Sequence, residues 1–310
     1  MRTRVAVIGG GQNCEHEVSL ASAASVAAAL DPDRYDVVRL TIEQTGDWSV
    51  DGRSVGLAGA VEVLGGCDVV LPVLHGPRGE DGTVAALCDL VGVPYVGSGV
   101  RAGALAMDKE ATKLVALSHG IATAYGTVVT AATADALAWD GPVVVKPVAA
   151  GSSQGVALVE EPGRLAGAVA AALALDDRVL VEEVVRGREI DLAVLGTRDG
   201  GRYVAPALEI RVPGFFDFTT KYDGSAEFLV PAALTDAELK ELEDAAVTMY
   251  DALGCAGVAR IDFFLTEHGP VLNEVNTMPG FTEQSQVPKM FAAAGTGYGA
   301  LLDRLIRDVV

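Results

Sequence analysis

The sequence contains few cysteines, and no two of them are close together. Its four cysteines are spread along the chain without a CxxC pair: Cys14, Cys67, Cys88 and Cys255. A zinc site built on cysteine pairs, or a disulfide framework, would need closer and more regular spacing. We therefore expect neither kind of site, and we expect reduced thiols, as in cytoplasmic proteins.

Basic residues are scarce as well. The chain has 23 lysines and arginines against 42 aspartates and glutamates, which gives a formal net charge of -19 and a pI near 4.5. Binding to nucleic acid depends on clustered lysine and arginine at the phosphates, so the composition argues against a nucleic-acid partner. A few locally placed cations would still be sufficient to bind a nucleotide.

The sequence also lacks long hydrophobic runs. No apolar segment is long enough to span a bilayer, and Met1–Arg4 leads directly into a strand-like segment without the pattern of a secretory signal peptide. We therefore expect a soluble cytoplasmic protein with no membrane partner. Half of the 310 residues are nevertheless apolar, which is enough for the cores of two or three domains.

The N-terminal segment has the pattern of an α/β domain. A β-branched run at 4–9 predicts a strand, residues 10–14 form a glycine-rich loop, and 15–30 predict a helix that Asn13 could cap. This order opens a doubly wound parallel sheet, in which ligands bind at the carboxyl ends of the strands. The loop GGGQNC lacks the GxGxxG spacing, which argues against NAD. Glu15 begins the helix, where it could serve a ligand or simply cap the helix dipole.

A second candidate at the same sheet edge is His75. The strand predicted at 69–74 ends in the loop HGPRGEDG, which contains this histidine, two acidic residues and three glycines. A histidine at a strand end is often structural. Because the carboxyl ends of parallel strands meet at one edge of a sheet, we expect His75 and Glu15 to lie close together.

The central part of the chain contains a candidate phosphate site. An apolar strand predicted at 142–147 includes Lys146, whose ammonium needs an anionic partner if it is buried. The small-residue loop 149–155 follows, and its backbone N–H groups and serine hydroxyls could bind phosphate oxygens. It is not a Walker A motif, because the lysine precedes the loop. The alternative is a plain hairpin turn.

Two further segments could belong to a nucleotide site. Glu182 and Glu183 lie on a strand predicted at 179–185, where they could recognise adenine and ribose or could be ordinary solvated side chains. The loop 213–224 is rich in aromatic residues, although these make up only 5% of the chain. Long loops of this kind often serve as lids over a reactive site.

A β-hairpin is predicted near the C-terminus. Two segments of alternating character, 260–265 and 271–276, flank a short turn at 267–269. Side chains on a strand alternate between two faces, and Leu272 is expected on the polar face of this hairpin. The apolar face would be formed by Ile261, Phe263, Leu265, Val271 and Val275.

A turn centred on His268 would place acidic side chains opposite one another. Asp262 would then face Glu274, and Arg260 would face Asn276. Facing carboxylates repel each other unless a cation lies between them, and Asp, Glu and Asn oxygens suit a hard ion such as Mg²⁺. We therefore predict a divalent metal site, the alternative being a hairpin whose charges are solvated.

Seven segments together resemble the motifs of ATP-grasp enzymes, and within that superfamily those of the D-alanine–D-alanine ligases. They occur in the family's order and span nearly the whole chain, so the set is far more specific than any one of them. The segments are EHEVSL from Glu15, HGPRGEDGT from His75, PYVGSGVRAGALAMDK from Pro94, VVVKPVAAGSSQGV from Val143, FFDFTTKY from Phe215, GVARIDFF from Gly257 and NEVNTMPGFTEQSQVPKM from Asn273.

The resemblance implies an ATP-grasp fold in three domains, α/β overall with α+β character in the C-terminal half. An N-terminal domain, 1–103, would contain the doubly wound parallel sheet and the first-substrate side. A central domain, 104–185, would contain the phosphate loop. A C-terminal domain, 186–310, would contain the lid loop, the metal hairpin and the second-substrate site. ATP would bind between the last two domains, and a homodimer is the usual state of the family.

The resemblance also implies the residues of the site. The metal, Mg²⁺ or Mn²⁺, would be held by Asp262, Glu274 and Asn276. ATP would be bound by Lys109, Lys146, Ser152, Ser153, Glu182, Glu183, Val185, Glu189, Phe215 and Lys221. The amino-acid substrates would be bound by Glu15, His75, Arg260, Ser285 and Gln286. The catalytic groups would be Glu15, Ser152, Tyr222, Arg260 and the backbone N–H of Gly280.

The implied reaction is the ATP-dependent ligation of two D-alanines for peptidoglycan precursors. The first carboxylate attacks the γ-phosphoryl group to give an acylphosphate, and the amine of the second D-alanine then displaces phosphate. Glu15, oriented through Ser152 and Tyr222, would bind the first ammonium. Arg260 and the Gly280 N–H would stabilise the tetrahedral oxyanion.

Two residues depart from the family's usual pattern. Gln154 stands where an apolar residue is usual, and Gln286 stands where Leu or Met is common, next to Ser285 in the expected second-substrate pocket. The pair Lys221–Tyr222 favours D-alanine over D-lactate as acceptor. The alternatives are an ATP-grasp ligase for another pair of D-amino acids in antibiotic biosynthesis or resistance, and an inactive nucleotide-binding regulatory protein, which would be expected to lack the catalytic acids.

Overall fold

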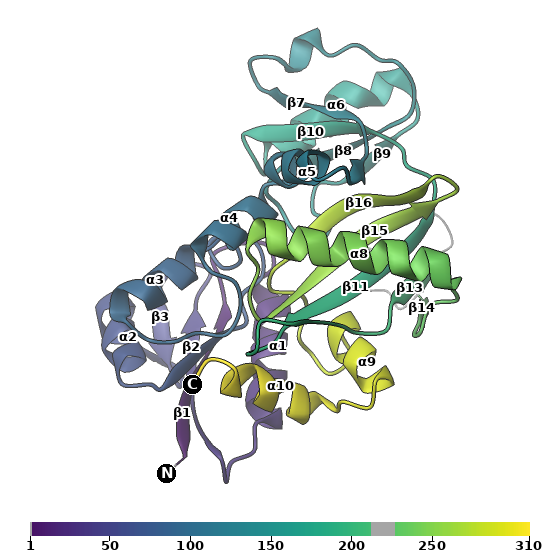
Figure 1. The fold of residues 1–310 in the computed structure, drawn as a ribbon. Coiled ribbons are helices and arrows are strands. Elements are labelled where there is room, and N and C mark those ends of the chain that lie inside the picture. The colour runs from purple at the N-terminus through teal and green to yellow at the C-terminus, as the bar shows by residue number, and fades with distance from the viewer. Residues whose placement is uncertain (1, 212–226) are drawn as a thin grey trace.

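The structure is a computed structural model, and it describes residues 2–211 and 227–310. These residues form three β-sheets with helices around them (Figure 1). This mixed α/β architecture agrees with the predicted fold class. Among the described residues, no helix is both long and apolar enough to cross a membrane.

The N-terminal sheet has a parallel centre and an antiparallel edge. Its order is β4-β3-β2-β1-β5, and β1 pairs in parallel with both β2 and β5. The strands are β1 (Thr3–Gly10), β2 (Tyr35–Ile42), β3 (Trp48–Val50), β4 (Arg53–Ser54) and β5 (Val69–Pro72). The helices of this region are α1 (His16–Ala29), α2 (Gly56–Gly65), α3 (Thr83–Val91) and α4 (Val100–Met107). Val5 to Ile8 are almost fully buried, as expected for a parallel strand that is covered on both faces.

The second sheet is small and antiparallel, in the order β7-β10-β8-β9. Its strands are β7 (Gly126–Thr130), β8 (Val143–Pro147), β9 (Ala157–Val159) and β10 (Arg178–Glu183). Around it lie α5 (Lys109–Ser118), the short 3₁₀ helix η1 (Ala134–Ala136) and α6 (Pro162–Leu173). Leu165 and Val169 of α6 share a core with Val145 of β8. Because neighbouring residues on a strand point to opposite faces, Lys146 points away from that core.

The third sheet has seven strands and contains the predicted hairpin. Its order is β14-β13-β11-β15-β16-β6, and β12 pairs with β11. The strands are β6 (Ala122–Thr123), β11 (Arg188–Gly196), β12 (Arg202–Val204), β13 (Leu208–Arg211), β14 (Glu227–Leu229), β15 (Val258–Thr266) and β16 (Gly269–Asn276). Helix α8 (Asp236–Leu253) lies across this sheet (Figure 1). Helices α9 (Gln286–Ala293) and α10 (Tyr298–Arg307) belong to a core that joins this sheet to β1 and α1.

The sequence specifies both the start and the buried face of α8. Thr235 Oγ1 accepts a hydrogen bond from the Glu238 N–H, and the Glu238 carboxylate accepts one from the Thr235 N–H. This capping box satisfies two donors that the first turn would leave unpaired. Leu242, Ala246 and Met249 recur at helical spacing and are fully buried in the core beneath the helix.

One strand crosses the predicted boundary between the central and C-terminal domains. β6 lies within the predicted central domain, yet it pairs with β16 of the third sheet. Strands of the second sheet otherwise fall between 126 and 183, and those of the third between 188 and 276. The predicted domain boundaries at 103 and 185 stay a prediction.

Replacing Leu242 with alanine should destabilise the unit formed by α8 and the third sheet. Leu242 is fully buried, so Leu242→Ala should lower the free energy of unfolding by about 3 kcal/mol through lost contacts and the cavity left behind. Urea denaturation followed by circular dichroism measures this change. Leu114→Ala is the matched control, because Leu114 is 62% exposed on α5. Equal midpoints for the two variants would show that the core is not where the structure places it.

Candidate active site

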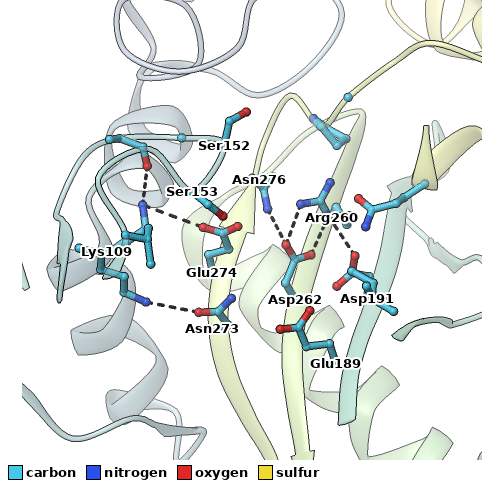
Figure 2. Close-up of a pocket in the computed structure, with 18 of the residues that line it drawn as sticks. Lys109, Ser152, Ser153, Glu189, Asp191, Arg260, Asp262, Asn273, Glu274 and Asn276 are labelled. Carbon is cyan, nitrogen blue, oxygen red and sulfur yellow. Dashed lines mark hydrogen bonds and ion pairs between the residues drawn. The ribbon is translucent and has the colours of Figure 1, made fainter. Parts of the chain in front are cut away.

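A cleft of about 650 Å³ collects residues from all three sheets. Its lining includes Glu15 and His75 from the carboxyl edge of the N-terminal sheet, Lys146 from β8 and Asp262 from β15. Figure 2 shows part of this lining. Segments that the sequence suggested as separate candidate sites therefore meet in one place.

The predicted pairing of the hairpin is confirmed. Asp262 lies opposite Glu274, and Arg260 lies opposite Asn276. The turn is not centred on His268, because the last pair before it joins 266 to 269. An irregularity between this turn and the acidic pair restores the predicted register.

That irregularity is a β-bulge on β16. Phe263 pairs with Leu272 and Asp262 pairs with Glu274. Asn273 is therefore an extra residue on β16 that pairs with no residue of β15. The bulge lets Asn273 and Glu274 both line the cleft. It also corrects one expectation: Leu272, predicted on the polar face, is buried in the core. Strict alternation fails at a bulge, and Asn273 was therefore missed as a cleft residue.

Three carboxylates form a row across adjacent strands. Asp191 of β11 lies opposite Asp262 of β15, which lies opposite Glu274 of β16. Like charges that face each other across strands destabilise a sheet, so this row needs a cation. Asp191 was not predicted as a site residue, because its place in the row depends on the β11–β15 pairing and not on any local motif.

Arg260 supplies positive charge beside this row. Its Nε and Nη2 donate to Oδ1 and Oδ2 of Asp262, each at 2.7 Å, and Nε lies 3.5 Å from Asp191 Oδ2. Asn276 Nδ2 donates to Asp262 Oδ2 at 3.0 Å, and Figure 2 shows these contacts. Burial alone would lower the pKa of Arg260, but Asp262 and Asp191 outweigh it and raise the pKa above its ordinary value. The guanidinium therefore stays charged and fixed in orientation.

Lys146 has the anionic partner that its burial requires. Its Nζ lies 2.5 Å from Glu182 Oε1, and it also donates to Asn273 Oδ1 at 3.3 Å. Lys113 forms an ion pair with the other oxygen of Glu182. Burial raises the pKa of Glu182, but Lys146 and Lys113 outweigh it and hold the pKa below its usual range. The predicted contact of Glu182 with adenosine stays a prediction.

Lys113 was not identified from the sequence, although a signal was present. It follows Lys109 by four residues on α5, so the two lysines share one face of the helix. Burial lowers the pKa of Lys113. Lys109 Nζ donates to the carbonyl of Ala150 at 2.7 Å and lies 4.0 Å from Glu274 Oε2. It thereby links the phosphate loop to the hairpin.

Glu15 lies in the cleft, and one of its two carboxylate oxygens is hydrogen-bonded to the protein. Ser152 Oγ donates to Oε1, whereas Oε2 is buried and has no hydrogen-bond partner among the described residues. The side chain makes no capping hydrogen bond to α1, so the capping alternative does not account for this residue. Gly76 and Gly151 make room for it, because a Cβ on either would lie 2.5 or 2.0 Å from Oε2.

His75 lies at the same sheet edge as predicted, but its ring nitrogens bond to the protein. Nδ1 lies 2.9 Å from the Met278 carbonyl and Nε2 lies 3.1 Å from Ser22 Oγ. Burial lowers the pKa of His75. Its predicted contact with substrate stays a prediction.

Glu80 was overlooked, although it belongs to the loop that follows His75. Its carboxylate accepts hydrogen bonds from the backbone N–H of Met278 at 3.1 Å and of Gly76 at 3.3 Å. Burial, and then the negative charge of Glu15, raise the pKa of Glu80 to about 7. The sequence showed that this loop is acidic, but it did not show that Glu80 would bond to Met278, which lies on a distant segment.

The remaining predicted residues surround the cleft. Ser153, Glu183, Val185, Glu189, Gly280, Ser285 and Gln286 line it. Phe215, Lys221 and Tyr222 lie outside the described residues. The binding roles of both groups stay predictions. Ser285 Oγ accepts a hydrogen bond from the Thr282 N–H at 3.1 Å, which shapes the loop that leads into α9.

Glu182→Gln should destabilise the protein, because it would leave two partly buried ammonium groups without their shared counter-ion. We expect the free energy of unfolding to fall by about 3 kcal/mol, measured by urea denaturation at neutral pH. Asp244→Asn is the matched control, since it neutralises a carboxylate in an exposed ion pair with Lys240 and should leave the midpoint unchanged. A midpoint for Glu182→Gln equal to that of the control would exclude a structural role for this cluster.

Comparison with known proteins places this site in a family. The model of the D-Ala-D-Ala ligase C-terminus matches residues 124–307, and that of the N-terminus matches residues 4–58 and 57–98. The D-alanine–D-alanine ligase of Mycolicibacterium smegmatis (strain ATCC 700084 / mc(2)155) is 42% identical, with 100% of this chain and 96% of the relative aligned.

Solved structures agree with the sequence comparisons. The VanG D-Ala:D-Ser ligase from Enterococcus faecalis superposes with a TM-score of 0.87 at 34% identity and covers 100% of both chains. The D-alanine–D-alanine ligase from Bacillus anthracis complexed with ATP gives 0.82 at 29% identity and covers 99% of this chain and 97% of that one. The resemblance and the fold class predicted from the sequence are therefore confirmed: this chain belongs to the D-alanine–D-alanine ligase family of ATP-dependent ligases.

Proposed function

We propose that this protein joins two molecules of D-alanine at the expense of ATP, giving D-alanyl-D-alanine, ADP and phosphate for peptidoglycan precursors. One observation carries the proposal: Glu15 Oε2 is buried without a hydrogen-bond partner among the described residues, in the cleft that Lys109 and Lys146 also line. A buried carboxylate oxygen left unpaired is costly, and a substrate ammonium would satisfy it. Membership of the ligase family supports the same reaction.

The first step would form an acylphosphate. With its ammonium at Glu15, the first D-alanine would direct its carboxylate toward ATP. A carboxylate oxygen attacks the γ-phosphorus while the bond to the ADP oxygen breaks. Lys109 and Lys146 would neutralise phosphate charge, which is the main contribution a protein can make to phosphoryl transfer.

The second step would form the amide bond. The amine of the second D-alanine attacks the acyl carbon, and the tetrahedral species then expels phosphate. Asp262 engages Nε and Nη2 of Arg260, and we infer that Nη1 would donate to an oxyanion or to the second carboxylate. The Gly280 N–H would be the other oxyanion donor, and Ser285 would contact the second carboxylate.

The oxygen donors on the hairpin fit a hard divalent cation. Asp262 accepts three N–H groups, whereas a carboxylate offers about four acceptor positions. Asn276 donates through Nδ2, and its Oδ1 would be the ligand atom. No cluster of three or more His, Cys, Asp and Glu side chains in the described part of the chain could hold a metal by itself, so Glu274 and substrate phosphates would complete the shell. Mg²⁺ or Mn²⁺ bound there would neutralise charge on the transferring phosphoryl group.

We also propose that the protein acts in the cytoplasm as a homodimer. All four cysteines are free, which supports a reducing compartment, and ATP is an intracellular substrate. The homodimer rests on the family resemblance.

Measuring ADP, phosphate and dipeptide together tests the proposed reaction. With ATP, Mg²⁺ and D-alanine we expect dipeptide and ADP in equal amounts, and little product with L-alanine or with D-lactate as acceptor. EDTA should stop both products, and Mg²⁺ or Mn²⁺ should restore them. Turnover with D-serine or another acceptor but none with D-alanine alone would overturn the proposal.

A methyl group at position 151 should displace Glu15, because its Cβ would lie 2.0 Å from Oε2. We expect Gly151→Ala to lower kcat/KM for D-alanine by about 100-fold, as a misplacement of roughly 1 Å can do. Gly163→Ala on α6 is the control, since a Cβ there has no neighbour within 4 Å. If steady-state kinetics showed equal activity in the two variants, Glu15 would not bind the first substrate.

A further inference from the structure

Both backbone polar groups of Met278 are held by side chains from the loop after β5. The Met278 N–H donates to Glu80 Oε1 at 3.1 Å, and the Met278 carbonyl lies 2.9 Å from His75 Nδ1. These partners are 198 and 203 residues away in sequence. Met278 lies two residues before Gly280, whose N–H is the proposed oxyanion donor.

The hydrogen-bond partners of His75 fix its tautomer. A carbonyl oxygen can only accept, so Nδ1 must carry the proton that bonds to Met278. In the neutral ring Nε2 is then an acceptor, and Ser22 Oγ donates to it over 3.1 Å. Ser22 Oγ in turn accepts from the Phe281 N–H at 3.4 Å. This chain of hydrogen bonds ends on the residue after Gly280.

Further contacts tie the same loop in place. Glu80 Oε2 accepts the Gly76 N–H, and the Glu80 carbonyl accepts from Thr277 Oγ1 at 3.4 Å. The Phe281 carbonyl accepts from Tyr298 of α10 at 2.5 Å. The backbone is therefore held on both sides of Gly280, mainly by residues of α1 and of the loop after β5.

We propose that Ser22, His75 and Glu80 form a clasp on residues 278–281 that positions the Gly280 N–H for the second step of the reaction. The inference rests on the proposed function. These three are positioning residues, since they act on the oxyanion through the backbone they hold. Removing an oxyanion donor typically lowers a rate by about 100-fold or more, and a small displacement of the donor has a related effect.

A weakened clasp has a specific chemical signature. Formation of the acylphosphate precedes any need for the oxyanion donor, so that step should continue. If attack by the second amine is slowed, water can attack the acylphosphate in its place, returning D-alanine and inorganic phosphate. ADP would then be released without an equal amount of dipeptide, whereas general loss of structure would lower both products together.

The test compares two serine variants on α1. Ser22→Ala removes the link between His75 and Phe281. Ser25→Ala is the control one turn away: Ser25 Oγ accepts from the N–H of Glu283 at 3.4 Å, beyond the clasped segment, and losing its hydrogen bond with Tyr298 would leave the Tyr298 OH donating to the Phe281 carbonyl. For Ser22→Ala we expect kcat for dipeptide to fall about tenfold, the dipeptide-to-ADP ratio to fall below one, and the KM for ATP to stay within about twofold. Ser25→Ala should keep the wild-type ratio.

Glu80→Gln provides a second, isosteric variant. A carboxamide has one acceptor oxygen, and its NH₂ would face one of the two N–H donors that the carboxylate now accepts. It should lower the dipeptide-to-ADP ratio in the same direction as Ser22→Ala, with thermal melting used to confirm that each variant is folded.

The outcomes separate this inference from the proposed function. A wild-type ratio in folded Ser22→Ala and Glu80→Gln, even with a lower kcat, would overturn the clasp while leaving the ligase reaction intact. Failure of the proposed function would appear earlier, as a wild-type protein that releases no ADP with D-alanine.

Discussion

The site depends on a row of three carboxylates that one sheet holds on adjacent strands. Asp191, Asp262 and Glu274 face each other in register, an arrangement that strand pairing alone would disfavour. Arg260 compensates the first two, and Lys109 approaches the third. In a chain with a net charge of -19, cations are few, and the structure concentrates several of them here. The sheet thus provides a rigid acidic surface whose charge is only partly balanced, which suits binding of a cation together with phosphates.

Much of this site could be predicted, because its parts follow from local patterns. The short turn between β15 and β16 limited the possible registers, so that Asp262 was placed opposite Glu274, and the bulge at Asn273 offsets the error in the predicted centre of the turn. A buried lysine on β8 required an anion, and Glu182 is that anion. The parallel strands β1 and β5 brought Glu15 and His75 to one edge, as their order in the sequence indicated. In each of these cases the periodicity of a single element, or the pairing of its neighbours, carried the necessary information.

What could not be predicted depends on contacts between elements that are distant in sequence. Asp191 joins the acidic row only through the pairing of β11 with β15, and Glu80 finds its partner on a loop almost 200 residues away. Leu272 was assigned to the wrong face because a bulge breaks the alternation. Bulges depend on how two strands fit together in the sheet and leave no clear trace in the hydrophobic pattern. Such features require the tertiary structure itself.

The bulge at Asn273 has a consequence for how this hairpin can change in length. It separates the acidic end of the hairpin, whose alignment is also set by β11, from the distal turn near Glu267. Loss of Asn273 would leave Glu274 opposite Asp262, because Asn273 is the extra residue of the bulge, but it would remove the amide oxygen that accepts from Lys146. None of the turn residues 266–269 is among the described residues that line the cleft. Relatives should therefore tolerate longer or shorter tips on this hairpin, while the spacing from Asn273 to Asn276 stays constant.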